Sequence, residues 1–218
     1  MTGEAERMLG EEVGAREAPS SGTPPNRETR TRLRRAEIVA AATQVFAARG
    51  YGGVGMRDIA DAVGIRGASL YHHFPSKEEI LFAICLTVTR EPVEENLPLL
   101  DAAGTPSERL AALVRAHIRH LRRRRLEYQV GAHERTSLTA EHLAETDQYR
   151  HYYNRRVREV LAAGMRAGEF RELDPKITAL GMLDMLNGVA AWIRGDSDAD
   201  VEAVEQTYLT LLFDGLHP

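Results

Sequence analysis

Apolar residues recur three or four positions apart along most of this chain, and this spacing limits its fold more than any other feature. Side chains at i, i+3 and i+4 share one face of an α-helix, whereas a half-buried strand needs strict alternation. Met56, Ile59, Ala60 and Val63 follow the helical spacing, and no series of short alternating runs joined by hairpin dipeptides is present. The 218 residues, 43% of them apolar, can bury a sizeable core. The sequence therefore predicts an all-α protein.

Residues that start or stop helices divide the chain into about nine expected helices. Gly64 suits a C-terminal cap, Pro75 stops a helix, and residues 76–79 can form a capping box. Asp174 and the proline that follows it favour a helix start. The helices are expected over about residues 31–50, 56–63, 67–74, 76–91, 106–121, 126–135, 140–167, 174–194 and 198–216.

Charge divides the chain into three parts. Residues 1–30 carry a net charge of −2 and are rich in Glu, Gly, Ser and Pro, so we expect a disordered tail. Residues 31–77 carry +4 and residues 78–218 carry −6. A basic head on an acidic body suits a protein whose head faces a polyanion, because neutralised phosphates release counterions. Chance clustering is the alternative explanation for so short a segment.

Several classes of protein are disfavoured by the sequence. The longest apolar run, residues 179–193, contains Asp184 and Asn187 and is shorter than the roughly 20 apolar residues that a membrane helix needs. The first residues include acids and show no secretory signal, so we expect a cytoplasmic protein without membrane contact. Cys85 is the single cysteine, which allows no intramolecular disulfide.

The histidines give little support for a metal site. His72 and His73 are neighbours, so their side chains diverge by about 100° on a helix. His117 and His120 could share zinc at i, i+3, but no third ligand is identifiable. No nucleophile or metal motif such as G-x-S-x-G or H-E-x-x-H occurs. We therefore expect no enzymatic activity, no metal and no cofactor.

Residues 56–74, MRDIADAVGIRGASLYHHF, have the pattern of two helices that cross steeply through a tight turn. Ala60 is small where the helices approach, Gly64 supplies the turn, and apolar side chains such as Ile59 and Leu70 fill the seam. The remaining side chains of the second helix are small or polar, so this helix could enter a major groove about 12 Å wide. The alternative is a helical ligand carrier or enzyme in which the hairpin is purely structural.

This region resembles the signature of the TetR family of repressors. The resemblance spans about residues 34–81 and is carried, in order, by Arg57-Asp58-Ile59-Ala60, Gly64-Ile65 and the run from Ser69 to Leu81. It implies a helix-turn-helix domain over residues 31–77 and a ligand-binding and dimerisation domain over residues 78–218. It also implies a homodimer that binds a palindromic DNA operator and is released by a small effector.

The resemblance assigns DNA contacts to seven positions. Arg57 would meet a base or phosphate. The residues that would face base edges are Arg66, Gly67 and Ser69. Those that would hold phosphates are Tyr71, His72 and Lys77. A guanidinium can pair bidentately with guanine, and a hydroxyl or ammonium suits a phosphate. Gly55 departs from the family, which usually has Thr or Ser there as N-cap and phosphate ligand, and this puts one backbone contact in doubt.

The body offers a dimer face and an effector pocket. The eighth helix is apolar nearly all round, which calls for cover on two sides. The dimer interface is expected at Leu180, Leu183, Val189, Tyr208, Leu211 and Leu212. The effector pocket is expected at Tyr128, Tyr149, Tyr152, Met185 and Trp192, although aromatic residues at such spacing are also typical of a core.

The nature of the effector is suggested by resemblance alone. The body is similar to TetR regulators of lipid and steroid breakdown that sense acyl-CoA thioesters, and an uncharged lipophile is the competing class. The four arginines of residues 122–125 would be a solvated face or a grip for phosphates. Ligand between the helices would displace the fourth helix and respace the two DNA-binding heads.

Overall fold

The structure is a computed structural model in which residues 26–193 and 197–217 are described. Apart from caps and turns these residues are helical, and no strand occurs among them, which confirms the all-α prediction. The chain forms two compact units that meet between Ile80 and Leu81, three residues after the expected boundary. No helix in the described ranges is long and apolar enough to cross a membrane.

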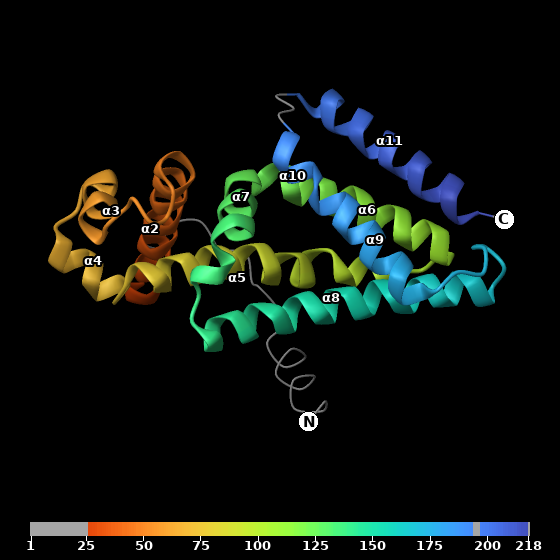
Figure 1. Cartoon of the computed structure of the whole chain (residues 1–218), viewed down its shortest axis with the longest axis horizontal. Coiled ribbons are helices and arrows are strands. Elements are labelled where there is room, and N and C mark those ends of the chain that lie inside the picture. The colour runs from red at the N-terminus through yellow and green to blue at the C-terminus, as the bar shows by residue number, and fades with distance from the viewer. Residues whose placement is uncertain (1–25, 194–196, 218) are drawn as a thin grey trace. The chain divides into compact units, whose positions relative to one another are not determined.

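The first unit holds α2 (Arg27–Arg49), α3 (Met56–Val63), α4 (Gly67–His73) and the start of α5 (Lys77–Glu95), drawn from red to yellow in Figure 1. The helix α2 begins at Arg27, so the prediction that the tail extends to residue 30 is wrong; residues 1–25 lie outside the described ranges. Asn26 explains the early start, since its side-chain oxygen accepts a hydrogen bond from the Thr29 N–H at 2.8 Å.

The turn between α3 and α4 follows the sequence pattern closely. Gly64 has φ 72° and ψ 36°, the left-handed conformation that favours glycine, and caps α3. Ala60 is buried at the crossing, and Ile59 and Leu70 are fully buried in the seam. The hairpin therefore fixes the direction of α4 within the unit.

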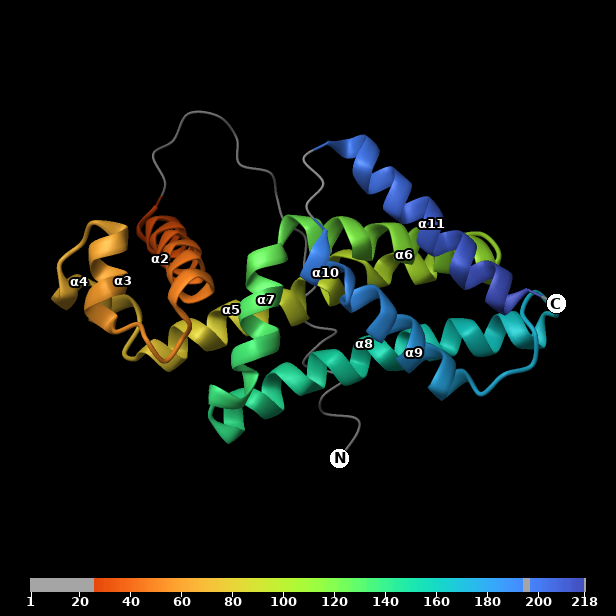
Figure 2. The same ribbon diagram turned by 45° about the horizontal axis from the view of Figure 1, so that its top comes forward.

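The second unit contains the rest of α5, six further α-helices and two short 3₁₀ turns. They are η1 (Leu97–Asp101), α6 (Pro106–Arg123), α7 (Arg125–Glu134), η2 (Arg135–Ser137), α8 (Ala140–Arg166), α9 (Pro175–Asn187), α10 (Val189–Trp192) and α11 (Asp198–Leu216), where η marks short 3₁₀ turns. In Figures 1 and 2, α8 runs along α9 and α6 runs along α11. A single apolar core joins these helices.

The end of α5 differs from the prediction. The helix was expected to end near Glu91, but it continues through Pro92 to Glu95. Proline has no N–H, so it cannot bind the carbonyl of Val88 four residues earlier. The Tyr128 hydroxyl from α7 donates to that carbonyl instead, at 3.2 Å. A distant side chain thus replaces the missing helical hydrogen bond.

The expected eighth helix, residues 174–194, is divided. The helix α9 ends at Asn187 and α10 begins at Val189, with Gly188 between them and Arg194 outside the described ranges. If α9 and α10 are counted together as one helix, the nine expected helices are all found within residues 26–193 and 197–217.

Candidate DNA-binding face and effector site

A groove of about 740 Å³ runs between α3 and α4 on the surface of the first unit. Its lining includes four of the seven predicted DNA contacts, Arg57, Arg66, Gly67 and Tyr71. These four residues are exposed, Tyr71 to 55%, although a tyrosine gains by burial. A face this open leaves α4 free to meet a partner outside the unit.

The other predicted contacts are less uniform. His72 is exposed, and Ser69 is half-buried. Lys77 is half-buried, and its ammonium donates to the backbone carbonyls of Tyr51 and Val54 at 2.8 and 2.9 Å. The ammonium also lies 4.0 Å from the centre of the Tyr51 ring. Lys77 therefore secures the loop before α3, a role that the sequence did not suggest.

The start of α3 is organised without a hydroxyl cap. Gly55 is the N-cap, and its N–H donates to the Asp58 carboxylate at 2.8 Å. Arg49 donates to the same carboxylate at 2.8 Å. The Gly55 N–H, and then Arg49, hold the pKa of Asp58 below its usual range. The first turn of α3 is thus tied to the end of α2.

The second unit contains a buried polar cluster that sequence reasoning missed. His117 on α6 accepts a hydrogen bond from the Tyr153 hydroxyl at Nδ1, at 3.1 Å. Its Nε2 lies 3.2 Å from the amide oxygen of Asn187, which can only accept, so Nε2 carries the proton. Burial lowers the pKa of His117 to about 4, against a smaller opposing effect of Asn187, and the ring stays neutral at pH 7.

One helical turn further along, His120 is only 1% exposed. Arg123 donates to its Nδ1 at 2.9 Å, so the proton of the neutral ring lies on Nε2. That nitrogen is buried and has no acceptor among the described residues. Burial, and then the positive charge of Arg123, lower the pKa of His120 to about 3. The Tyr128 ring stands edge-on to His120, with the ring centres 5.7 Å apart.

Asn96, between α5 and η1, completes the cluster. It is 3% exposed, and its amide nitrogen makes no hydrogen bond of normal geometry with the described residues. Burial raises the pKa of the Tyr153 hydroxyl above its usual range, and the nearby Asn96 amide opposes this as the smaller effect. Among the described residues, the Nε2–H of His120 is therefore buried without an acceptor, and the Asn96 amide has only the Tyr153 hydroxyl near it.

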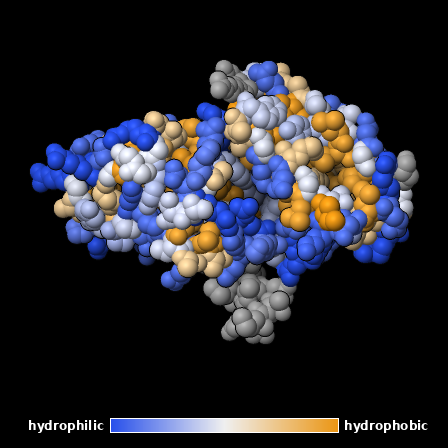
Figure 3. Space-filling model, viewed as in Figure 1, coloured by the Kyte–Doolittle hydropathy of each residue, from blue (hydrophilic) through white to orange (hydrophobic). Residues whose placement is uncertain are grey.

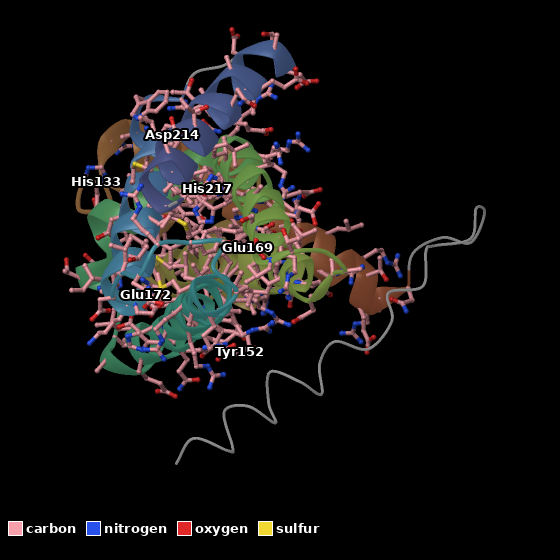
Figure 4. All side chains as sticks on the ribbon, turned by 90° about the vertical axis from the view of Figure 1, so that its right-hand side faces the viewer. His133, Tyr152, Glu169, Glu172, Asp214 and His217 are labelled. Carbon is pink, nitrogen blue, oxygen red and sulfur yellow. The ribbon has the colours of Figure 1, made fainter. Side chains whose placement is uncertain are left out.

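The predicted effector residues are only partly brought together. Tyr128 lies in the polar cluster, and Met185 is half-buried. Tyr152 lies at the edge of the second unit in Figure 4, with its ring 5.1 Å from the Arg155 guanidinium. Trp192 is 50% exposed, so it faces solvent. Tyr149 is half-buried on α8.

The signal for the missed residues was present in the sequence. His117 and His120 are polar residues on the buried face of a helix, a placement that calls for polar partners inside the protein. No group of three or more metal-binding side chains lies within the described ranges. The partners of His117, Tyr153 and Asn187, stand 36 and 70 residues away, so spacing could not have found them.

Comparison with known proteins agrees with both units. Residues 38–84 match the family of bacterial regulatory proteins described as the tetR family, and residues 103–216 match the tetracyclin repressor-like C-terminal domain. This chain belongs to the TetR family. TetR-type proteins are transcriptional regulators, so the prediction that the chain is not an enzyme is confirmed by its family.

The relatives of this TetR protein are repressors and regulators. The repressor KstR2 of Rhodococcus jostii is 30% identical over 84% of this chain and 91% of its own length. The ketosteroid regulator KstR2 of Mycobacterium tuberculosis has 27% identity and a TM-score of 0.77, over 85% of this chain and 95% of that one. AibR, in complex with isovaleryl coenzyme A and operator DNA, has 30% identity and a TM-score of 0.74, over 83% and 98%.

The TetR protein also carries exposed apolar side chains on α9, α10 and α11, and Figure 3 shows apolar surface over this part of the second unit. Leu180 is 45% exposed and Leu211 is 59% exposed. Of the other predicted interface residues, Tyr208 and Leu212 are half-buried, whereas Leu183 and Val189 are buried in the subunit core. Leu183 and Val189 therefore do not face outward as expected.

The arginines of residues 122–125 in this TetR protein bind side chains within the second unit. Arg122 pairs with Asp198 at 2.6 Å, and Arg123 pairs with Glu95. Arg124 donates to both oxygens of Glu91, and Arg125 lies 3.5 Å from the side-chain oxygen of Gln129. A run so occupied is poorly suited to grip phosphates.

Proposed function

We propose that this protein represses transcription as a homodimer that binds a palindromic operator and leaves it when a small effector binds the second unit. The supporting observation is the exposed face of α3 and α4, where Arg57, Arg66 and Tyr71 line one groove. Two such heads spaced one helical turn apart, about 34 Å, would read two half-sites.

Operator binding is tested with genomic fragments selected by the purified protein. Arg57→Ala is expected to weaken binding by about 1–3 kcal/mol, because a guanidinium contact to a base or phosphate is lost. Arg115→Ala, at an exposed arginine of α6, is the matched control and should leave binding unchanged. Equal binding by wild type and Arg57→Ala would reject the assigned face.

The dimer is supported by the exposed apolar side chains of α9 and α11. Single exposed apolar residues are common, but here Ile177, Leu180 and Leu211 lie exposed on two helices. Leu180→Glu is expected to yield monomers in sedimentation velocity, because a carboxylate would be buried at the interface. Leu33→Glu, at a leucine of α2 that is 53% exposed, should leave the dimer intact. A monomeric wild type would refute this part of the proposal.

The effector site is supported by the buried polar cluster. Both the Nε2–H of His120 and the amide of Asn96 are buried donors without a hydrogen bond of normal geometry among the described residues, so the fitting ligand carries acceptor oxygens. The histidines are buried and neutral, and Glu91 lies 3.9 Å from His120, which favours an uncharged carbonyl over a carboxylate. An acyl-CoA thioester supplies such a carbonyl, and AibR is a relative crystallised with one. A lipophilic ketone is the alternative ligand.

Release would act through α5, whose end is held beside the cluster. Glu91 binds Arg124 and lies 3.9 Å from His120, so a ligand at His120 would disturb the contacts that position α5. A coupling of about 1–3 kcal/mol would weaken operator binding roughly 5- to 150-fold.

The effector test is a titration of a preformed operator complex. Isovaleryl-CoA and longer acyl-CoAs are expected to release the DNA, whereas free CoA, which lacks the thioester carbonyl, is not. His120→Leu should abolish the response, and His120→Gln, which keeps a donor, should retain part of it. If no acyl-CoA changes the affinity, that effector class is excluded, and release by medium-chain ketones would point to the lipophile class.

A further inference from the structure

The helix α2 extends 11 residues ahead of the segment that matches the family, which begins at residue 38. At about 1.5 Å per residue this adds roughly 16 Å of helix. The face of α2 that buries Ile38 and Ala42 continues toward the N-terminus through Arg34, Arg30 and Arg27. At Ile38 and Ala42 this face packs against the rest of the unit. In the extension the same face carries arginines instead of apolar residues.

Arg35 anchors the end of this extension that adjoins the matched segment. Its guanidinium donates to the backbone carbonyl of His73 and lies 3.9 Å from the centre of the Phe74 ring. His73 is the last residue of α4. This end of the extension thus lies beside the C-terminal end of α4, the helix that is proposed to enter the major groove. All of these contacts lie within the first unit.

Three cations of the extension have no acidic partner among the described residues of the unit. Arg27, Arg30 and Arg32 are exposed, and no hydrogen bond or ion pair of their side chains occurs among the described residues. Residues 27–35 contain five arginines and one acid, Glu28. Arg34, by contrast, pairs with Glu37 at 2.6 Å.

These arginines are a cost to the isolated helix. Positive charges in a first turn oppose the helix dipole, and like charges at i, i+3 repel. Arg27 and Arg30 have both disadvantages. The extension also gains little from packing, because Leu33, its one large apolar residue, is 53% exposed. A polyanion bound along the extension would turn these unfavourable charge interactions into favourable ones.

We propose that residues 27–35 form a second DNA contact, in which Arg27, Arg30 and Arg32 bind backbone phosphates beside the groove entered by α4. The contact is independent of base sequence, because phosphates carry no sequence information. This inference rests on the proposed operator binding and adds a binding site outside the matched family domain.

The test compares Arg27→Gln/Arg30→Gln/Arg32→Gln with a charge-matched control, Arg115→Gln/Arg150→Gln/Arg166→Gln, whose arginines are exposed in the second unit. Fluorescence anisotropy on a mixed-sequence duplex of about 40 base pairs reports affinity between about 50 and 200 mM salt. Each lost phosphate contact lowers the slope of log affinity against log salt by about 0.9.

If each subunit of a dimer loses at least one contact, the slope falls by about 1.8 or more, and wild-type affinity drops about 12-fold more than variant affinity over this salt range. The control should keep the wild-type slope. Amide exchange over residues 27–35 should also slow when the duplex is added to wild type.

An unchanged slope in the triple variant overturns the second contact, as does unaltered amide exchange over residues 27–35. If such a variant still binds the duplex and Arg57→Ala weakens binding, operator binding stands without the second contact. If wild type binds no duplex at about 50 mM salt, the proposed function and this inference both fail.

Discussion

Acid should destabilise this protein through its two buried histidines. The pKa of His117 is lowered to about 4 and that of His120 to about 3, whereas both titrate near 6.5 in the unfolded chain. Between these values the unfolded chain binds protons that the folded protein does not. The stability that comes from the neutral rings is therefore complete above pH 6.5 and is lost as the pH falls toward 4.

The size of the effect follows from the separation between the folded and unfolded pKa values. One unit corresponds to 1.36 kcal/mol, so at pH 5 each histidine costs about 2 kcal/mol relative to pH 7.5. The two together cost about 4 kcal/mol, a large part of the 5–15 kcal/mol that holds a typical domain together. Carboxylates add their own acid dependence at lower pH.

Urea unfolding at pH 7.5 and pH 5, at one protein concentration, measures the loss. His117→Gln and His120→Gln are each expected to reduce the pH dependence by about 2 kcal/mol, because glutamine does not titrate. His72→Gln, at an exposed histidine of α4, is the control and should behave as wild type. If both buried variants keep the full wild-type dependence, neutral buried histidines are not its cause.

Three further predictions concern packing and the DNA-binding unit. Gly164→Ala places a Cβ 2.2 Å from the Phe170 ring and should destabilise the fold by about 1–3 kcal/mol in thermal unfolding, whereas Gly215→Ala meets open space and should not; equal stabilities would contradict this packing. Lys77→Met should lower the unfolding free energy by about 1–3 kcal/mol, because two carbonyls lose a donor, and a variant of wild-type stability that lowers only the salt slope of DNA binding would show Lys77 to be a phosphate ligand after all. Gly55→Ser should strengthen DNA binding, since the new Cβ lies 3.4 Å from Asp58, an ordinary contact, and the hydroxyl can reach a phosphate; unchanged affinity would argue against a backbone contact there.

Local chemistry made much of the fold predictable. The bounds of α3 and α11 follow from spacing and caps, and Gly64 adopts the left-handed conformation that the turn requires. The Ser76 hydroxyl accepts from the Glu79 N–H at 3.1 Å, as half of the expected capping box. Such features depend on residues within four positions of one another, which a single sequence displays directly.

The errors arose where a distant residue decides the outcome. Pro92 was expected to end a helix, but the hydroxyl of Tyr128 supplies the missing donor from 36 residues away. Val189 was assigned to the dimer face because its helix is apolar all round, yet the break at Gly188 and the fold of the subunit bury it completely. Aromatic residues likewise suggested a pocket, while the buried polar cluster depends on contacts between four helices.

Pro92 gives α5 a weak point at a fixed place. Before it, the hydrogen bonds of α5 belong to the helix itself; at Val88 the bond belongs to α7 and can be exchanged for another partner. Tyr128→Phe would remove this hydrogen bond and leave the Val88 carbonyl without a donor. A ligand that accepts a hydrogen bond from the Tyr128 hydroxyl would remove the bond to Val88 reversibly. The hydroxyl oxygen of Tyr128 would then determine how easily α5 bends near Pro92.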